Sequence, residues 1–197
     1  MNPSWAVFGE CEGEMSDKPQ TRNYMAEAAP LSALSHPEHV WIHDYWRARK
    51  PEAGLPSRRD IDPTDFPKLL PRIAMIAVDD RDENVHYRYR LAGTEIVTRA
   101  GRDPTGKYFE DLYQGDYLAT ATALYDELRQ SRQPHFSERV FPIGDGESYL
   151  RYDRLILPLA TDHQKVDQFL LLIVVVEQGG AVHREGSFQR AGRGPKD

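Results

Sequence analysis

The sequence predicts an α+β domain: a five-stranded antiparallel sheet, short helices inserted between strands 2 and 3, and an N-terminal helix packed on the sheet. Three observations support this fold class. An apolar strand and an alternating strand, at 73–78 and 85–91, are joined by a polar turn. Three further strands follow a group of short helical segments. The last strand is apolar from Phe169 to Val176, so both of its faces need cover. Antiparallel strands with helices grouped between them define the α+β class.

The chain length and composition fit one folded domain with two tails. The chain has 197 residues and 40% hydrophobic residues, which is enough to build a core. Residues 1–30 mix Gly, Pro, Ser and acidic residues without period, and residues 179–197 are rich in Gly and Arg. We therefore expect disordered tails at 1–30 and 179–197 and a folded domain at 35–178.

Charge and cysteine usage exclude several classes of protein. The formal net charge of -6 disfavours nonspecific nucleic-acid binding, which depends on clustered Lys and Arg. The one cysteine, Cys11, allows no intramolecular disulfide and no cysteine-based zinc site. No signal peptide and no apolar run long enough to span a membrane are present in the sequence. We expect a cytoplasmic protein with neither nucleic-acid nor membrane partners.

The N-terminal helix is predicted to begin at Ser35, with Ser35 and Glu38 as a capping box and Pro37 in the first turn. At 100° per residue, one wide face collects five side chains. They are Trp41, Ile42, Tyr45, Trp46 and Ala48. We expect this face to cover the outer side of the last strand, and the same helix offers a surface for a homodimer.

The next segment, Leu55–Pro71, contains four prolines and reads as an ordered connector. Residues Asp62 to Asp65 can form a short helical turn within it. The first hairpin follows, with strands at 73–78 and 85–91 and a loop of about five residues. The second strand alternates apolar with polar residues, which is typical of a strand with one solvated face.

The middle of the chain is helical. Glu95–Ala100 is predicted as a short helix ended by Gly101, and Lys107–Tyr113 as a turn or two. A longer helix should run from Asp116, as its cap, to Ser131. Three strands close the domain, at 136–143, 147–160 and 169–177, and Gly144-Asp145-Gly146 marks the turn between the first two.

One stretch permits an enzymatic alternative. Gly101 to Lys107 fits G-x4-G-K, the spacing of a phosphate-binding loop, but Tyr108 stands where a Ser or Thr must bind Mg²⁺. A phosphate loop also follows a parallel strand, and none is predicted here. Two turn-forming glycines are the preferred interpretation.

Histidines and cysteine give little support for a metal or cofactor. His36, His39 and His43 share one helical edge, but basic neighbours favour a solvated edge over a metal site. The cysteine that a flavin adduct needs lies only in the tail, and His135 is a weak candidate for a haem ligand. The cofactor, if any, is unknown, and no metal site is expected.

Three segments in order resemble a family of small bacterial PAS-like proteins: LPSRRDIDP at 55–63, YRLAGT at 89–94, and G-D-TG within 101–112. The resemblance implies a PAS-like fold with a pocket between the sheet and the central helices. Four side chains with a polar group are candidates to line that pocket: Tyr89, Thr94, Tyr108 and Tyr152.

The resemblance also implies a sensory or regulatory role in signal transduction, with an unidentified small molecule, a signalling protein, or both as partners. No output domain is expected within the chain. A ligand-free protein-interaction adaptor is the alternative, and a small-molecule enzyme is a third reading. No catalytic residues are assigned, because no triad, nucleophile elbow or acid–base pair is recognisable.

Overall fold

The computed structural model describes residues 27–80, 84–143 and 148–179. Its sheet has six antiparallel strands in the order β1-β4-β5-β6-β2-β3. The strands are β1 (Glu27–Ala29), β2 (Ile73–Asp79), β3 (His86–Ala92), β4 (His135–Ile143), β5 (Ser148–Leu159) and β6 (Gln168–Gly179). The predicted α+β class is confirmed, with one strand more than expected. That strand, β1, lies inside the range predicted as a tail and pairs with β4.

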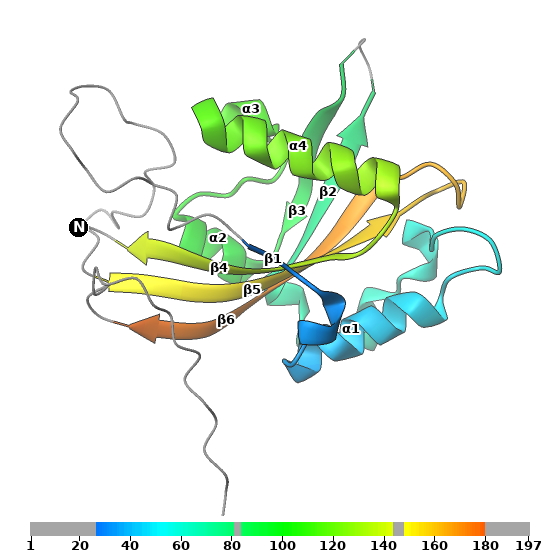
Figure 1. Ribbon diagram of the computed structural model, residues 1–197, viewed down its shortest axis with the longest axis horizontal. Coiled ribbons are helices and arrows are strands. Elements are labelled where there is room, and N and C mark those ends of the chain that lie inside the picture. The colour runs from blue at the N-terminus through cyan, green and yellow to red at the C-terminus, as the bar shows by residue number, and fades with distance from the viewer. Residues whose placement is uncertain (1–26, 81–83, 144–147, 180–197) are drawn as a thin grey trace, which may run out of the picture.

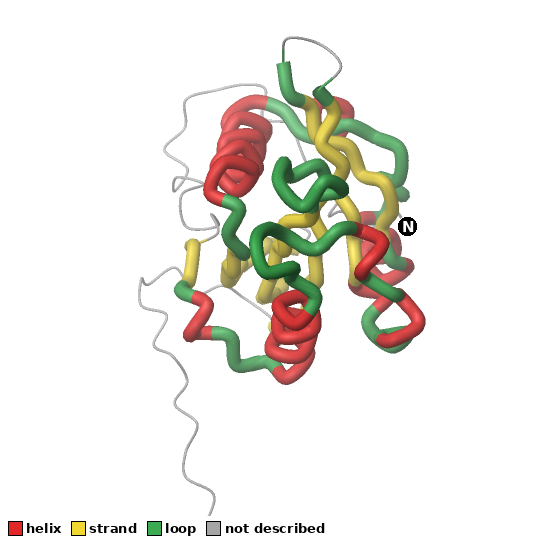
Figure 2. Tube along the Cα trace, turned by 90° about the vertical axis from the view of Figure 1, so that its right-hand side faces the viewer, coloured by secondary structure: helices red, strands yellow, loops and turns green. Residues whose placement is uncertain are grey.

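Four α-helices lie among the described residues: α1 (Pro37–Ala48), α2 (Thr94–Ala100), α3 (Phe109–Leu112) and α4 (Gly115–Ser131). Short 3₁₀ turns occupy Leu31–Ala33 and the connector, at Arg58–Asp60, Pro63–Asp65 and Leu70–Arg72. Figure 1 shows α4 across one side of the sheet and α1 on the other, and Figure 2 shows the same layers from the side. We call the α4 side the inner face and the α1 side the outer face. None of these helices is long and apolar enough to cross a bilayer.

The strand β6 is buried on both faces, as its apolar run requires. Phe169 packs against Tyr125 of α4 on the inner face, with ring centroids 5.0 Å apart. Its neighbour Leu170 is also buried. On the outer face, His39 of α1 approaches the carbonyl oxygen of Leu172, 3.3 Å from its Nε2 atom. The two helices thus cover opposite sides of the same central strand.

The start of α1 differs from the prediction. His36, not Ser35, is the N-cap, and its Nδ1 atom accepts a hydrogen bond from the Glu38 backbone N–H at 3.3 Å. The Glu38 carboxylate does not form the expected capping box, because it pairs with the Arg72 guanidinium. This ion pair connects the first turn of α1 to the turn that precedes β2. Pro37 does occupy the first turn, as predicted.

The wide face predicted for α1 is only partly buried. Ile42, Tyr45 and Trp46 belong to the core, whereas Trp41 remains 43% exposed. The Trp46 indole N–H donates to the carbonyl oxygen of Pro158 on β5, at 2.9 Å. Ala48 is exposed as well. The helix therefore uses a narrower face than the predicted one.

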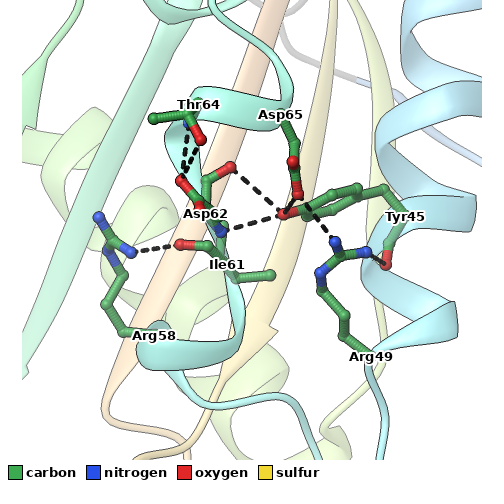
Figure 3. A network of polar contacts seen from close by, with 7 residues as sticks. All are labelled: Tyr45, Arg49, Arg58, Ile61, Asp62, Thr64 and Asp65. Atoms are coloured by element: carbon green, nitrogen blue, oxygen red, sulfur yellow. Dashed lines mark hydrogen bonds and ion pairs between the residues drawn. The ribbon is translucent and has the colours of Figure 1, made fainter.

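The LPSRRDIDP segment has a structural role, which Figure 3 shows. The Tyr45 hydroxyl accepts from the Asp62 backbone N–H at 3.0 Å and donates to the Asp65 carboxylate at 2.8 Å. Arg49 bonds the same Asp65 oxygen at 2.9 Å and stacks over the Tyr45 ring. Arg58 donates to the carbonyl oxygen of Ile61. The segment therefore holds the connector against α1, and its predicted helical turn at Pro63–Asp65 is confirmed.

The YRLAGT and G-D-TG segments form close turns. A Cβ atom at Gly93 would lie 2.3 Å from the carbonyl oxygens of Leu70 and Pro71, so only glycine fits at the start of α2. Gly101 ends α2 in the left-handed conformation, at φ 57°, as predicted. Gly106 also has a positive φ, of 83°. These glycines are turn formers, and no parallel strand precedes them among the described residues, so the phosphate-loop alternative does not hold.

The helix α4 begins one residue before the predicted cap. Its N-cap is Gln114, with no side-chain capping bond, and Asp116 lies in the first turn. A carboxylate in the first turn still interacts favourably with the positive end of the helix dipole. Tyr125 and Leu128 are buried, while Leu118 and Ala121 are partly buried against the core. These residues form the apolar face of α4, which points toward the inner face of the sheet.

Candidate functional site

A polar cluster occupies the inner face where β4 and β5 pair. Arg139 lies opposite Tyr152, and Ser137 lies opposite Arg154. Directly paired residues of antiparallel strands share one face, so these two pairs lie side by side on the same surface. Their inner orientation follows from charge interactions of Arg154 with Tyr125 of α4. We call the following residues the inner cluster: Tyr89, Tyr113, Tyr117, Tyr125, His135, Ser137, Arg139, Tyr152 and Arg154.

The arginine side chains meet tyrosines from the facing helix. Arg139 hydrogen-bonds the hydroxyl groups of Tyr117, on α4, and of Tyr152, on β5. Tyr117 is 40% exposed, although its hydroxyl group interacts with this partly buried arginine. Its ring therefore connects the inner cluster with the surface of the molecule.

The other side of the inner cluster is formed by Tyr89 and Tyr113. Tyr89 comes from β3, and its hydroxyl group lies 2.8 Å from that of Tyr113, which follows α3. Phe109 of α3 packs against both rings, with centroids 5.7 and 5.5 Å away. The polar groups thus sit within aromatic walls supplied by β3, α3 and α4.

The arginines carry the permanent charges of the inner cluster, because the pKa shifts of its other titratable groups favour their neutral forms. Burial raises the pKa of Tyr89 to about 12 and also raises the pKa of Tyr117 and Tyr125. Burial, with the charges of Arg154 and Arg139, lowers the pKa of His135 to about 4. At neutral pH the tyrosines are therefore protonated and the histidine is neutral. None of them supplies a negative charge to offset the guanidinium groups.

Several buried polar atoms of the inner cluster have no hydrogen-bond partner in the described part of the chain. They are Nε and Nη2 of Arg154, Nε of Arg139 and Oγ of Ser137. Arg154 is only 9% exposed and Ser137 is 0% exposed. Neither arginine forms an ion pair with a carboxylate among the described residues. Buried polar groups are almost always paired in folded proteins, so this group requires an explanation.

The four candidate residues from the sequence fall into two groups. Tyr89 and Tyr152 belong to the inner cluster. Thr94 is exposed at the start of α2, and so it does not join them. Tyr108 lies beside the outward side chains of β3: its ring meets His86 edge-on, and its hydroxyl group donates to Asp79 at 2.8 Å. The structure therefore brings together two of the four.

Sequence reasoning did not find Arg139, Arg154 or Ser137. A charged residue on a strand usually marks a solvated face, so residue type alone does not indicate that these arginines lie on the inner face. The sequence did contain one signal for Arg154. It lies two residues after Tyr152 on β5, and residues two apart on a strand point to the same face. The register across the β4–β5 turn, which pairs Arg154 with Ser137, was needed to complete the inference.

The histidines of α1 do not form a solvated edge as expected. His39 is fully buried, and burial lowers its pKa to about 4. His36 caps the helix, and His43 stacks on Trp46 with centroids 6.2 Å apart. Within the described ranges, no three His, Cys, Asp or Glu side chains come together as a metal site. Cys11 lies outside those ranges.

Comparison with known proteins assigns the chain to a family. A family model described as a PAS domain matches residues 34–174. No curated protein and no solved structure matches at the threshold applied. The matched range contains α1, the connector, the central helices, the strands β2 to β5 and the first part of β6. The predicted resemblance is confirmed, and this chain belongs to the PAS domain family.

Proposed function

We propose that this PAS domain is a sensory or regulatory module that binds a small ligand at the inner cluster. PAS domains are in general sensory or regulatory modules, and the family supplies that broad assignment. The observation that favours a ligand is the set of buried donors on Ser137, Arg139 and Arg154 that have no partner among the described residues. A buried charge without a partner is costly, and a bound ligand that pairs with it would recover that cost.

Binding fits the chemistry of the inner cluster better than catalysis does. Its permanent charges are guanidinium groups, which keep their protons at any physiological pH and cannot act as acids or bases. The tyrosines, with their raised pKa values, hold their protons as well. We therefore propose a receptor for a ligand and assign no catalytic residue.

The sheet offers a path from this site to α1. Arg154 and Pro158 both belong to β5, and the carbonyl oxygen of Pro158 accepts the hydrogen bond from Trp46 of α1. A ligand that draws Arg154 toward the inner face would favour one packing of β5 against α1 over another. Such a shift requires only that the ligand bind the two packings with different affinity.

The exposed face of α1 favours a protein partner as the receiver of the signal. Trp41 and Val40 are 43% and 40% exposed, and they line a shallow, open depression with Pro37, Asp44 and Tyr45. Asp44 and Arg47 form an ion pair at 3.2 Å on the same helix. We propose that the partner is a second copy of this chain. Two antiparallel α1 helices related by a two-fold axis would exchange these opposite charges.

Native mass spectrometry of the full chain tests the ligand proposal. We expect a mass above that of the polypeptide, and we expect the excess to disappear on denaturation. The control is the Arg154→Met variant, which should carry less of the same compound. A wild-type mass equal to the polypeptide alone, together with no stabilisation by any compound in a thermal-shift screen, would support the ligand-free adaptor instead.

A further inference from the structure

The arrangement of unpartnered atoms on Arg154 carries information about the class of ligand. The Nε and Nη2 atoms form one side of the planar guanidinium group, and their N–H bonds point in nearly the same direction. Both atoms are buried and without a partner in the described residues. This edge is the fork that binds the two oxygen atoms of a carboxylate or the oxygen atoms of a phosphate.

Two further donors lie next to this fork. Ser137 is the direct cross-strand partner of Arg154, and its Oγ atom is buried without a partner. Arg139 lies two residues along β4 from Ser137 on the same face, within reach of long side chains. Its Nε atom is likewise unpartnered. Three side chains with unpartnered N–H or O–H donors thus occupy neighbouring positions on one face of the sheet.

The surroundings of these donors provide positive charge and aromatic surface but no described acidic partner. Tyr89 and Tyr125 carry no negative charge at neutral pH, because burial raises the pKa of each, and neither arginine is ion-paired with a described carboxylate. The rings of Tyr113 and Tyr117 lie edge to face, with centroids 4.9 Å apart. An anion with an apolar body matches this combination of charge and aromatic surface.

We propose that the inner cluster binds a small carboxylate with an aromatic or aliphatic body, held by the Nε–Nη2 edge of Arg154. Arg139 Nε and Ser137 Oγ donate further hydrogen bonds to the carboxylate oxygens. Tyr117, which is 40% exposed, lies where a ligand would enter from the surface. This inference rests on the proposed ligand-binding function and names the ligand class.

Benzoate is a suitable probe, because it combines a carboxylate with a phenyl body. Benzamide is nearly the same shape without the charge, and inorganic phosphate supplies the charge without the apolar body. Isothermal titration of the full chain with each compound should show saturable binding of benzoate. Benzamide and phosphate should bind at least roughly tenfold more weakly, because a hydrogen bond to a charged group and the apolar contact are each lost.

Variants of Arg154 test the geometry. Arg154→Met removes both charge and fork and should weaken benzoate binding roughly tenfold or more. Arg154→Lys keeps the charge without the fork and should also weaken it, which separates planar recognition from charge alone. Arg151→Met is the matched control. Arg151 lies three residues earlier on β5, where its charge interacts with that of Asp153. Asp153 also interacts electrostatically with His36 of α1. Arg151 therefore belongs to the outer face, and its removal should leave benzoate binding unchanged.

The outcomes separate this inference from the proposed function. Benzamide binding as tightly as benzoate, or benzoate binding that survives Arg154→Met, would overturn the carboxylate assignment. Phosphate binding without benzoate binding would overturn it too. A neutral compound retained in native mass spectra would support the receptor function but contradict the carboxylate assignment. If none of the three probes binds and no compound is retained, both proposals fail.

Discussion

Ser137 and Arg154 are cross-strand partners on β4 and β5, and both are buried with polar atoms that have no partner among the described residues. A PAS domain that served only as a packed scaffold would gain stability from apolar residues at these two positions. Their retention of polar groups on the inner face is the physical basis for the ligand proposal. It also leads to a prediction about the ligand-free protein.

Arg154→Met should stabilise the ligand-free chain by about 1–4 kcal/mol, since it replaces a buried, unpaired charge by an apolar side chain of similar length. Urea denaturation of the chain after removal of any bound compound measures the free energy of unfolding. Arg151→Met, on the same strand, should change it by less than about 0.5 kcal/mol. A loss of stability in Arg154→Met would show that the guanidinium group has an internal partner.

The two tryptophans of α1 should differ sharply in their contributions to stability. Trp46 is 2% exposed and donates to Pro158, so Trp46→Ala should cost roughly 3–5 kcal/mol. Trp41 stacks on Tyr45 at 5.1 Å but is largely open to solvent, so Trp41→Ala should cost about 1 kcal/mol. If the two variants lost equal amounts of unfolding free energy in urea denaturation, Trp41 and Trp46 would not differ in burial as described.

Trp41 should matter for assembly instead. Sedimentation velocity of the wild-type chain is expected to show a dimer, and Trp41→Ala is expected to shift it to a monomer. Leu91→Ala is the matched control, because Leu91 of β3 is 39% exposed but lies away from α1. A wild-type monomer, or a dimer that Leu91→Ala and Trp41→Ala weaken equally, would remove α1 as the dimer surface.

The buried histidine of α1 makes stability depend on pH. Burial lowers the pKa of His39 from 6.5 to about 4. Between these values the unfolded chain binds a proton that the folded chain does not, so stability should fall as the pH drops from 6.5 to 4. The contribution is roughly 3 kcal/mol. His39→Gln should make the dependence shallower, because a glutamine side chain does not titrate. Its amide can still donate to the Leu172 carbonyl oxygen, so the contact is kept.

The control for His39 is Ile42→Val, a small core change on the same helix. It should lower the free energy of unfolding at every pH by a similar amount and leave the slope unchanged. If His39→Gln leaves the slope of the wild-type curve between pH 6.5 and 4 intact, other groups account for the acid sensitivity. Neutral His135, on the inner face, would be the next candidate.

The fold was largely predictable, because strands and helices have different periods. The alternation of Tyr87 and Tyr89 with Arg88 placed β3 in the sheet, and the apolar run of β6 required two covered faces. The strand β1 was not predictable: three residues carry no period, and their pairing with β4 depends on tertiary structure.

The site was only partly predictable. Tyr89 and Tyr152, which lie in the inner cluster, were candidates because tyrosine combines an apolar ring with a polar group. Arg154 was missed because residue type alone favours the surface for an arginine. Tyr108 lies apart from the inner cluster, since its place depends on the turn that sets it beside His86 rather than on strand alternation. Register and turn geometry, which arise from tertiary packing, decide these cases.

The central claim is that the Arg154 fork holds a carboxylate. The most direct measurement is the NMR signal of the Arg154 Nε–H group, assigned by its loss in Arg154→Lys and followed during titration with benzoate and with benzamide. We expect benzoate to move this signal saturably downfield, as for a new hydrogen bond to an anion, and benzamide to leave it in place. A signal that stays still while benzoate binds would contradict the claim.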